Sequence, residues 1–150
     1  MRKRNMKKWW MVCAALVCVL SAQGQAVRQM YLYAVKGADS LYLDRYEAVP
    51  AVSGARPCMI FVFGGGFVDG TRDDARYVPF FEYMAAKGIT VVSIDYRLGL
   101  REVIASGDFS AGHVVGTFMR TVAMATEDLY DATAYVLANA EPVSYTHLTL

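Results

Sequence analysis

The fold is decided by the stretch Cys58-Met59-Ile60-Phe61-Val62-Phe63-Gly64-Gly65-Gly66-Phe67, in which an apolar run leads directly into three glycines. A continuously apolar run such as residues 59–63 is typical of a strand covered on both faces of a sheet. Glycines directly after a strand allow bare backbone N–H groups to approach a ligand closely. The stretch therefore predicts a buried central strand followed by a turn suited to holding negative charge.

A second apolar run follows at residues 89–94 and ends in Asp95-Tyr96-Arg97-Leu98. Between the two runs, residues 77–87 carry apolar side chains at near-helical spacing, and Gly88 stops that pattern as a helix cap would. A strand, a helix and a strand in this order predict a right-handed parallel crossover.

The flanking segments complete an α/β pattern. Residues 30–34 and 41–46 are rich in aromatic and branched side chains on either side of a turn-like stretch, which predicts a hairpin. Residues 100–117 have little periodicity and predict a loop or short irregular helices. Over residues 121–140, apolar side chains recur at steps of three and four, which predicts an amphipathic helix.

Taken together, these motifs resemble the N-terminal half of an α/β-hydrolase. The members of that family that the sequence resembles are secreted bacterial esterases and lipases, namely carboxylesterases or esterases of the feruloyl- or acetyl-xylan-esterase kind. In such enzymes a His-Gly-Gly-Gly loop after the third strand lends N–H groups to the oxyanion hole. Gly64, Gly65 and Gly66 match those glycines, and the resemblance implies that Gly65 and Gly66 are the donors. It also implies that Phe67 lines the substrate pocket, whereas Phe63 replaces a histidine that normally braces the loop.

The motif Asp95-Tyr96-Arg97-Leu98 resembles the element that ends the fourth strand in the same family. We expect a structural role, in which the Asp95 carboxylate and the Arg97 guanidinium pair bidentately and fix the following loop. Asp95 is not the expected triad acid, because that residue follows the nucleophile in this family. Residues 41–44 and 126–132 also resemble family elements, so the resemblance covers most of residues 30–140.

The family's nucleophile motif is absent from the sequence. Ser110, in Asp108-Phe109-Ser110-Ala111-Gly112, imitates it, but Ser110 follows a loop-like stretch rather than a buried strand. His113 is likewise poorly placed as a general base. We therefore expect the nucleophile, acid and base beyond residue 141. The predicted fold is a truncated α/β-hydrolase, with an N-terminal hairpin and the start of a parallel sheet with flanking helices.

Residues 1–24 have the pattern of a cleavable signal peptide, which predicts a secreted or periplasmic protein. Five basic residues precede an apolar stretch and a small-residue cleavage site; an uncleaved anchor is the alternative. Cleavage changes the formal charge from +1 to −4, because five positive charges leave and no negative ones do. The mature chain then has no basic face for nucleic acid or a membrane. Cys58 is left without a disulfide partner and is expected to be a buried thiol.

The last residues, 142–150, resemble the translation of a transposase-adapter sequence used in preparing DNA libraries. We interpret them as a read-through tail, with a natural β-prone tail as the alternative. The predicted organisation is thus a signal peptide at 1–24, the N-terminal part of a hydrolase domain at 25–141, and the tail at 142–150.

The predicted function is carboxylic-ester hydrolysis through a serine acyl-enzyme in the full-length parent. This segment would carry only the oxyanion loop and be inactive alone. The expected substrate is a small-molecule or carbohydrate-linked ester, with no cofactor and no metal. One alternative is a non-catalytic hydrolase-like binding protein, suggested by Phe63. A nucleotide-binding oxidoreductase is less favoured, because Asp69 stands at the last glycine of Gly-x-Gly-x-x-Gly. The acidic residues at 69, 73 and 74 fit no metal-ligand spacing.

Overall fold

The computed structural model describes residues 25–50, 56–140 and 145–149. The predicted signal peptide lies outside these residues. Among them, no helix is long and apolar enough to cross a bilayer. The elements in chain order are β1 (Gln25–Lys36), β2 (Asp39–Val49), β3 (Arg56–Val62), α2 (Val78–Ala86), β4 (Thr90–Ile94), α3 (Arg101–Ser106), α4 (Ala111–Ala138) and β5 (Tyr145–Thr149).

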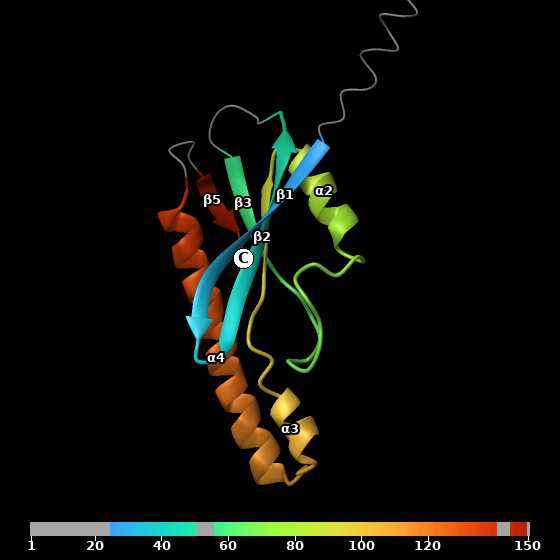
Figure 1. Cartoon of the computed structure of the whole chain (residues 1–150), viewed down its shortest axis with the longest axis vertical. Helices are drawn as coiled ribbons and strands as arrows, with labels where there is room; N and C mark the ends of the chain where they lie inside the picture. Colours follow the sequence, from blue (N-terminus) through green and yellow to red (C-terminus); the bar gives the residue numbers. More distant parts are fainter. Residues whose placement is uncertain (1–24, 51–55, 141–144, 150) are drawn as a thin grey trace, which may run out of the picture.

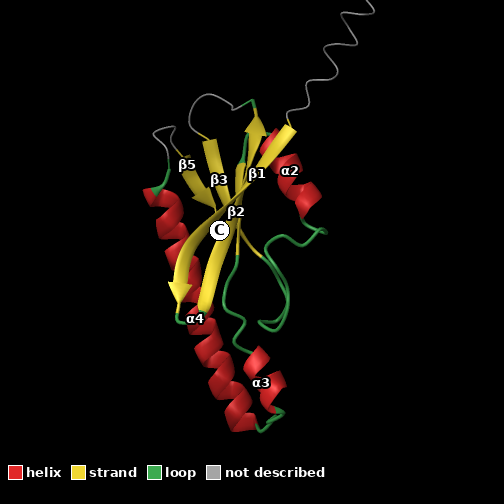
Figure 2. Cartoon of the chain, in the orientation of Figure 1, coloured by secondary structure: helices red, strands yellow, loops and turns green. Residues whose placement is uncertain are grey.

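The strands form one twisted mixed sheet in the order β1-β2-β4-β3-β5 (Figures 1 and 2). The β1–β2 hairpin is antiparallel and pairs through β2 with β4, again antiparallel, whereas β3 runs parallel to β4. All five residues of β4 are buried, as expected of a central strand. The predicted hairpin, the parallel pair and the intervening helix are therefore confirmed.

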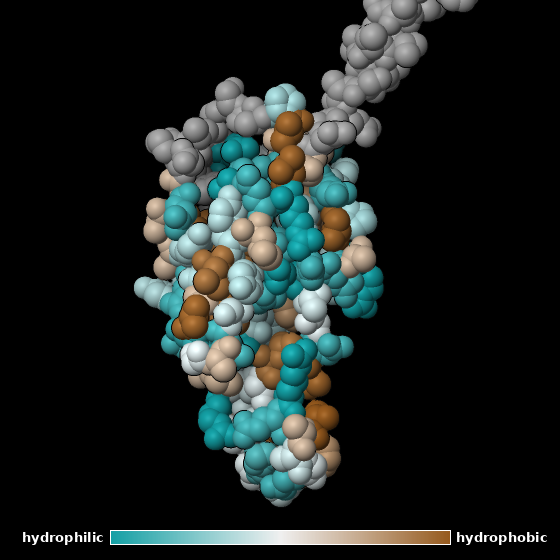
Figure 3. Space-filling model, in the orientation of Figure 1, coloured by the Kyte–Doolittle hydropathy of each residue, from teal (hydrophilic) through white to brown (hydrophobic). Residues whose placement is uncertain are grey.

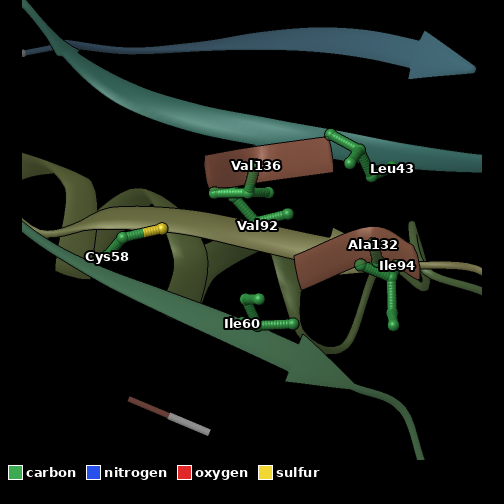
Figure 4. Packing of buried hydrophobic residues seen from close by; sticks show 7 residues of the cluster. All are labelled: Leu43, Cys58, Ile60, Val92, Ile94, Ala132 and Val136. Atoms are coloured by element: carbon green, nitrogen blue, oxygen red, sulfur yellow. The ribbon is translucent and has the colours of Figure 1, made fainter. Parts of the chain in front are cut away.

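Two hydrophobic clusters lie on opposite faces of the sheet. On one face, α4 packs through Ala132 and Val136 against side chains of β2, β3 and β4 (Figure 4). On the other, Phe81 and Ala85 of α2 pack against Tyr46 and Val91. The first cluster also contains the fully buried Cys58, which is a free thiol as predicted. Burial raises the pKa of this thiol to about 11.

Helix α4 begins ten residues earlier than the predicted start at residue 121. The expectation of a loop or irregular helices over 100–117 holds for the short helix α3 but is wrong for residues 111–117. In this half of α4 the buried side chains are Thr117 and Thr121, whereas Val115 and Met119 are exposed. Hydrophobic periodicity therefore cannot reveal it. Figure 1 shows this half extending beyond the sheet beside α3.

Strand β5 lies within the segment interpreted as a read-through tail. It pairs parallel with the outer edge of β3, with Arg56 opposite Tyr145 and Cys58 opposite Leu148. A strand at this edge is compatible with either origin of the segment. The adapter origin of residues 142–150 stays a prediction.

Candidate active site

Two loops leave the carboxyl ends of the parallel strands β3 and β4, and both therefore lie at the same edge of the sheet. We call residues 63–77 the glycine loop and residues 95–100 the Asp95 loop. The two loops contact each other directly. The Leu100 N–H donates to the Phe67 carbonyl at 3.1 Å, and Arg101 Nε of α3 donates to the Val68 carbonyl at 2.7 Å.

The glycine loop adopts a backbone that ordinary residues rarely take. Gly65 has a φ of 150°, Gly66 of 62° and Phe67 of 60°. A Cβ on Gly65 would lie 1.8 Å from the Asp69 carbonyl oxygen, so this glycine is required sterically. Gly66 has open space around it and is required only by its backbone angle. Phe67 is a bulky residue in the left-handed region, a strained geometry that often accompanies functional sites.

The N–H groups of Gly65 and Gly66 are free to bind a ligand. The turn is closed instead by the N–H groups of Val68 and Asp69, which donate to the Gly65 carbonyl at 3.2 and 3.3 Å. Within the described residues, neither glycine N–H donates a hydrogen bond, and both glycines are exposed to solvent. Strand β3, which leads into these glycines, is buried only at Cys58 and Ile60, so the expectation of a strand covered on both faces is wrong for it. Exposed backbone donors after a strand can stabilise a negatively charged oxygen.

Aromatic side chains surround the two ends of the glycine run. Phe63 is buried, and its ring lies 4.5 Å from that of Tyr96. The Tyr96 hydroxyl donates to the Phe63 carbonyl at 2.8 Å. The Phe67 ring stands edge-on to Tyr96 and to Phe118 of α4, each at 6.1 Å. Nothing in the sequence points to Phe118, because the residues before it lack helical periodicity.

The expected pairing of Asp95 with Arg97 is wrong. Asp95 accepts a hydrogen bond from Arg72 Nη1 at 2.6 Å, whereas Arg97 points to α4. There, Arg97 Nε and its backbone N–H both contact the fully buried Asp128 carboxylate, at 3.0 and 2.9 Å. These bonds raise the pKa of the Arg97 guanidinium. The two side chains therefore connect the loop to different elements, and the structural role of the motif stays a prediction.

Arg72 is a central residue that the sequence analysis missed. Besides Asp95, its Nε lies 3.0 Å from the fully buried Asp44 of β2, and its guanidinium lies 5.5 Å from the Tyr42 ring centre. Its carbonyl accepts a hydrogen bond from Ser93 Oγ of β4 at 2.6 Å. Burial raises the pKa of Asp95, and the attraction of Arg72 opposes that rise. We call residues 70–77, the second half of the glycine loop, its returning limb. Arg72 thus connects the returning limb to the strands β2 and β4.

The acidic residues of the glycine loop each face an arginine: Asp69 faces Arg101, Asp73 faces Arg28, and Asp74 faces Arg76. Hydrogen bonds from Arg76 lower the pKa of Asp74 to about 2. In the part of the chain that the structure describes, no three His, Cys, Asp or Glu side chains are grouped so that they could hold a metal ion.

Ser110 does not form a triad here. It is the exposed residue before α4, and its N–H donates to the Asp108 carboxylate at 2.9 Å. His113 Nδ1 lies 3.9 Å from the other oxygen of Asp108. Among the described residues, the Ser110 hydroxyl makes no hydrogen bond with His113. The expectation that Ser110 is not the nucleophile stays a prediction.

A pocket of about 420 Å³ lies where both loops meet the start of β2 and α4. Its walls come from the glycine loop, the Asp95 loop and the two neighbouring elements. The lining side chains include Phe63, Asp95, Tyr96, Arg97 and Met124.

The model of the carboxylesterase family matches residues 8–114, which is more than half of the chain. The chain belongs to the carboxylesterase family. The match covers the glycine loop and the Asp95 loop, so family membership and the geometry concern the same region.

Curated relatives are esterases of much greater length. Fumonisin B1 esterase of Sphingopyxis macrogoltabida is 36% identical over 69 residues, covering 45% of this chain and 12% of that protein. Esterase B1 of Culex pipiens is 34% identical over 61 residues, covering 41% of this chain and 11% of that protein. The matched segments thus span about a tenth of the length of these relatives.

The fold is shared with solved esterases. The propionate-bound esterase 2 of Thermogutta terrifontis superposes with a TM-score of 0.59 and 23% identity, over 85% of this chain and 40% of that one. The same esterase phosphorylated by paraoxon gives a TM-score of 0.58 and 24% identity, over 79% of this chain and 39% of that one. These similarities confirm the predicted α/β-hydrolase fold, of which the chain contains part.

Proposed function

We propose that the full-length parent of this chain hydrolyses carboxylic esters through a serine acyl-enzyme. Residues 25–141 supply the oxyanion hole, and the nucleophile, acid and base lie beyond residue 141. The proposal is supported most directly by the glycine loop, where two exposed glycines directly after β3 have N–H groups without a hydrogen-bond partner among the described residues. Ester hydrolysis passes through a tetrahedral oxyanion, and unpaired N–H groups stabilise that charge.

In this proposal, Gly65 and Gly66 donate to the oxyanion. The steric requirement at Gly65 supports the assignment, since the clash with Asp69 rules out the compact turn for any other residue. The Gly65 carbonyl already accepts two hydrogen bonds, which fixes the turn before a substrate arrives. Donors held in place in this way need no reorganisation during the reaction.

The substrate has an apolar part that lies against Phe67. This ring contacts Phe118, and further large apolar side chains, Ile104 and Phe109, are exposed on the adjoining α3–α4 segment. Figure 3 shows hydrophobic surface between the glycine loop and α3. Such a surface suits an acyl or alcohol group with substantial apolar area, in a small-molecule or carbohydrate-linked ester. Export by the segment 1–24, to the periplasm or outside the cell, belongs to the same proposal.

The test compares Gly66→Ala with Gly37→Ala in the complete polypeptide encoded by the gene. Both glycines have nearly the same φ, 62° and 64°, and both have open space around them. Each substitution therefore carries the same backbone cost, of about 1–2 kcal/mol. Gly37 lies in the β1–β2 turn and is not among the residues that line the pocket.

We expect Gly66→Ala to lower kcat on p-nitrophenyl esters by about 10²-fold, because the strained peptide turns its N–H away from the oxyanion. Gly37→Ala should leave kcat unchanged. Equal kcat values for the two variants would contradict the assignment of Gly66.

The non-catalytic alternative is tested by labelling the complete polypeptide with a fluorophosphonate, which reacts with activated serines. Stoichiometric labelling and ester turnover support the enzyme. A folded polypeptide that is neither labelled nor active would instead be a binding protein of this fold.

A further inference from the structure

Tyr96 lies between the two ends of the glycine run. Its hydroxyl donates to the carbonyl of Phe63, the residue before the run, at 2.8 Å, and both residues are buried. Its ring also stands edge-on to Phe67, the residue after the run, with ring centres 6.1 Å apart. One side chain from the Asp95 loop therefore contacts both residues that flank the candidate oxyanion donors.

Gly70 closes this arrangement from the opposite side. Its φ is 114°, and a Cβ on it would lie 2.4 Å from the Phe63 ring and 2.8 Å from the Gly64 carbonyl oxygen. The Phe63 ring thus contacts the Tyr96 ring, with ring centres 4.5 Å apart, and lies so close to the backbone of Gly70 that position 70 has no room for a side chain.

The geometry of Phe63 is transmitted to the donors through the backbone. A peptide group is planar, so fixing the Phe63 carbonyl also fixes the Gly64 N–H. The Gly65 N–H is then only the two backbone dihedrals of Gly64 away. Because Gly64 is exposed and has no atom within 4 Å of a Cβ position, side-chain packing does not restrain those dihedrals. The restraint must come from the two ends.

We propose that Tyr96 is a positioning residue for the oxyanion donors Gly65 and Gly66, acting through the Phe63 carbonyl, with Gly70 as the bare backbone that this packing requires. The inference rests on the proposed function, because it assigns Tyr96 a role in catalysis through those donors. In this inference, the loop is held at the Phe63 carbonyl and not through a polar side chain at position 63.

The test is Tyr96→Phe in the complete polypeptide, which removes the hydroxyl and keeps the ring. Tyr46→Phe is the matched control. Tyr46 is equally buried, its hydroxyl has no hydrogen-bond partner among the described residues, and it packs against Phe81 on the α2 face of the sheet. We measure kcat and KM on p-nitrophenyl esters, together with amide hydrogen exchange in the peptide that contains residues 63–67.

We expect Tyr96→Phe to lower kcat by about three- to tenfold, the loss that corresponds to one neutral hydrogen bond, with KM nearly unchanged. Hydrogen exchange of the 63–67 peptide should accelerate. Tyr46→Phe should change neither kcat nor exchange in that peptide. A purely structural role for the Tyr96 hydroxyl would lower the unfolding temperature and leave kcat of the folded protein unchanged.

Unchanged kcat and unchanged exchange in Tyr96→Phe would overturn the inference while leaving the proposed function intact. An unsubstituted polypeptide that hydrolyses no ester would overturn the proposed function and the catalytic role of Tyr96 with it. Gly70→Ala offers a second check, because the clash with Phe63 should accelerate exchange of the 63–67 peptide even where the hydroxyl is present.

Discussion

The glycine loop and the Asp95 loop leave neighbouring parallel strands, but they are built on opposite principles. The glycine loop holds three consecutive exposed glycines, and among the described residues its N–H groups at Gly65 and Gly66 have no hydrogen-bond partner. The first three residues of the Asp95 loop are instead each bonded to another part of the molecule: the Asp95 carbonyl to Tyr33, the Tyr96 hydroxyl to Phe63, and the Arg97 N–H to Asp128.

The comparison shows how a loop with free donors can keep its shape. Unpaired N–H groups cannot stabilise the turn that displays them, so its geometry depends on the two hydrogen bonds that the Gly65 carbonyl accepts within the loop and on contacts with neighbouring segments. Here Arg72 joins the returning limb of the glycine loop to β2 and to the Asp95 loop, and the Asp95 loop is fixed in turn by α4. One set of contacts is made by Arg72, and the other joins the Asp95 loop to α4. Substitutions in each set measure how far the shape of one loop depends on the other.

Arg72→Ala should have the largest effect on stability. The Arg72 side chain is only 14% exposed, and its removal leaves the fully buried Asp44 with one partner, Arg28. Removing one member of a buried ion pair costs about 3–5 kcal/mol. We expect this loss in the free energy of unfolding of the complete polypeptide, measured by urea denaturation.

Arg76→Ala is the control for Arg72→Ala, from the same limb of the glycine loop. Its side chain is 78% exposed and pairs with the local Asp74. The substitution should change stability little, because exposed ion pairs contribute little. A similar loss for the two variants would show that the limb depends on arginine charge in general and not on the contact with Asp44 and Asp95.

Asp128→Asn should have the next largest effect. The substitution keeps the shape of the side chain but replaces the charged carboxylate, which accepts hydrogen bonds from Arg97, with a neutral amide. A hydrogen bond to a charged group contributes about 1.5–3 kcal/mol, and we expect a loss of that size in the free energy of unfolding. Because Arg97 lies in the Asp95 loop, hydrogen exchange there should also accelerate.

Glu127→Gln is the matched control for Asp128→Asn. Glu127 binds the same arginine, but its side chain is 53% exposed whereas that of Asp128 is buried completely. We expect a much smaller loss of stability. If Glu127→Gln were as damaging as Asp128→Asn, the Asp95 loop would be held by surface charge and not by the buried carboxylate.

The same comparison explains what the sequence could predict. The strands at residues 59–63 and 89–94 were predictable because continuous apolar runs of this length are typical of strands inside a sheet. The glycine turn was predictable because consecutive glycines after a strand indicate unusual backbone angles, which Gly65 and Gly66 adopt. The role of Gly65 and Gly66 as oxyanion donors stays a prediction.

The wrong or missing predictions concern contacts between distant segments and one half of a helix. Asp95 and Arg97 are two positions apart, yet one points to Arg72 and the other to Asp128, so proximity in sequence misled the pairing. Arg72 lies among charged neighbours and has the pattern of a solvated loop residue. In the first half of α4, threonines are buried and large apolar side chains are exposed, which is the opposite of the pattern expected for an amphipathic helix.

Tyr33→Phe should have the smallest effect on stability. It tests a contact made by the backbone of the Asp95 loop, whereas the other substitutions test contacts made by side chains. The Tyr33 hydroxyl of β1 donates to the Asp95 carbonyl at 2.6 Å, and burial raises the pKa of this phenol. Loss of one such hydrogen bond should lower the free energy of unfolding by about 0.5–1.5 kcal/mol.

Tyr31→Phe, on the same strand, is the control for Tyr33→Phe, since the Tyr31 hydroxyl contacts only the exposed Gln29 side chain. It should leave stability unchanged. Because the Asp95 carboxylate still holds Arg72 in Tyr33→Phe, exchange in the 63–67 peptide should not accelerate there. An acceleration would mean that the glycine loop depends on the backbone of the Asp95 loop as a whole, and that Tyr96 and Arg72 are two of several contacts that position it.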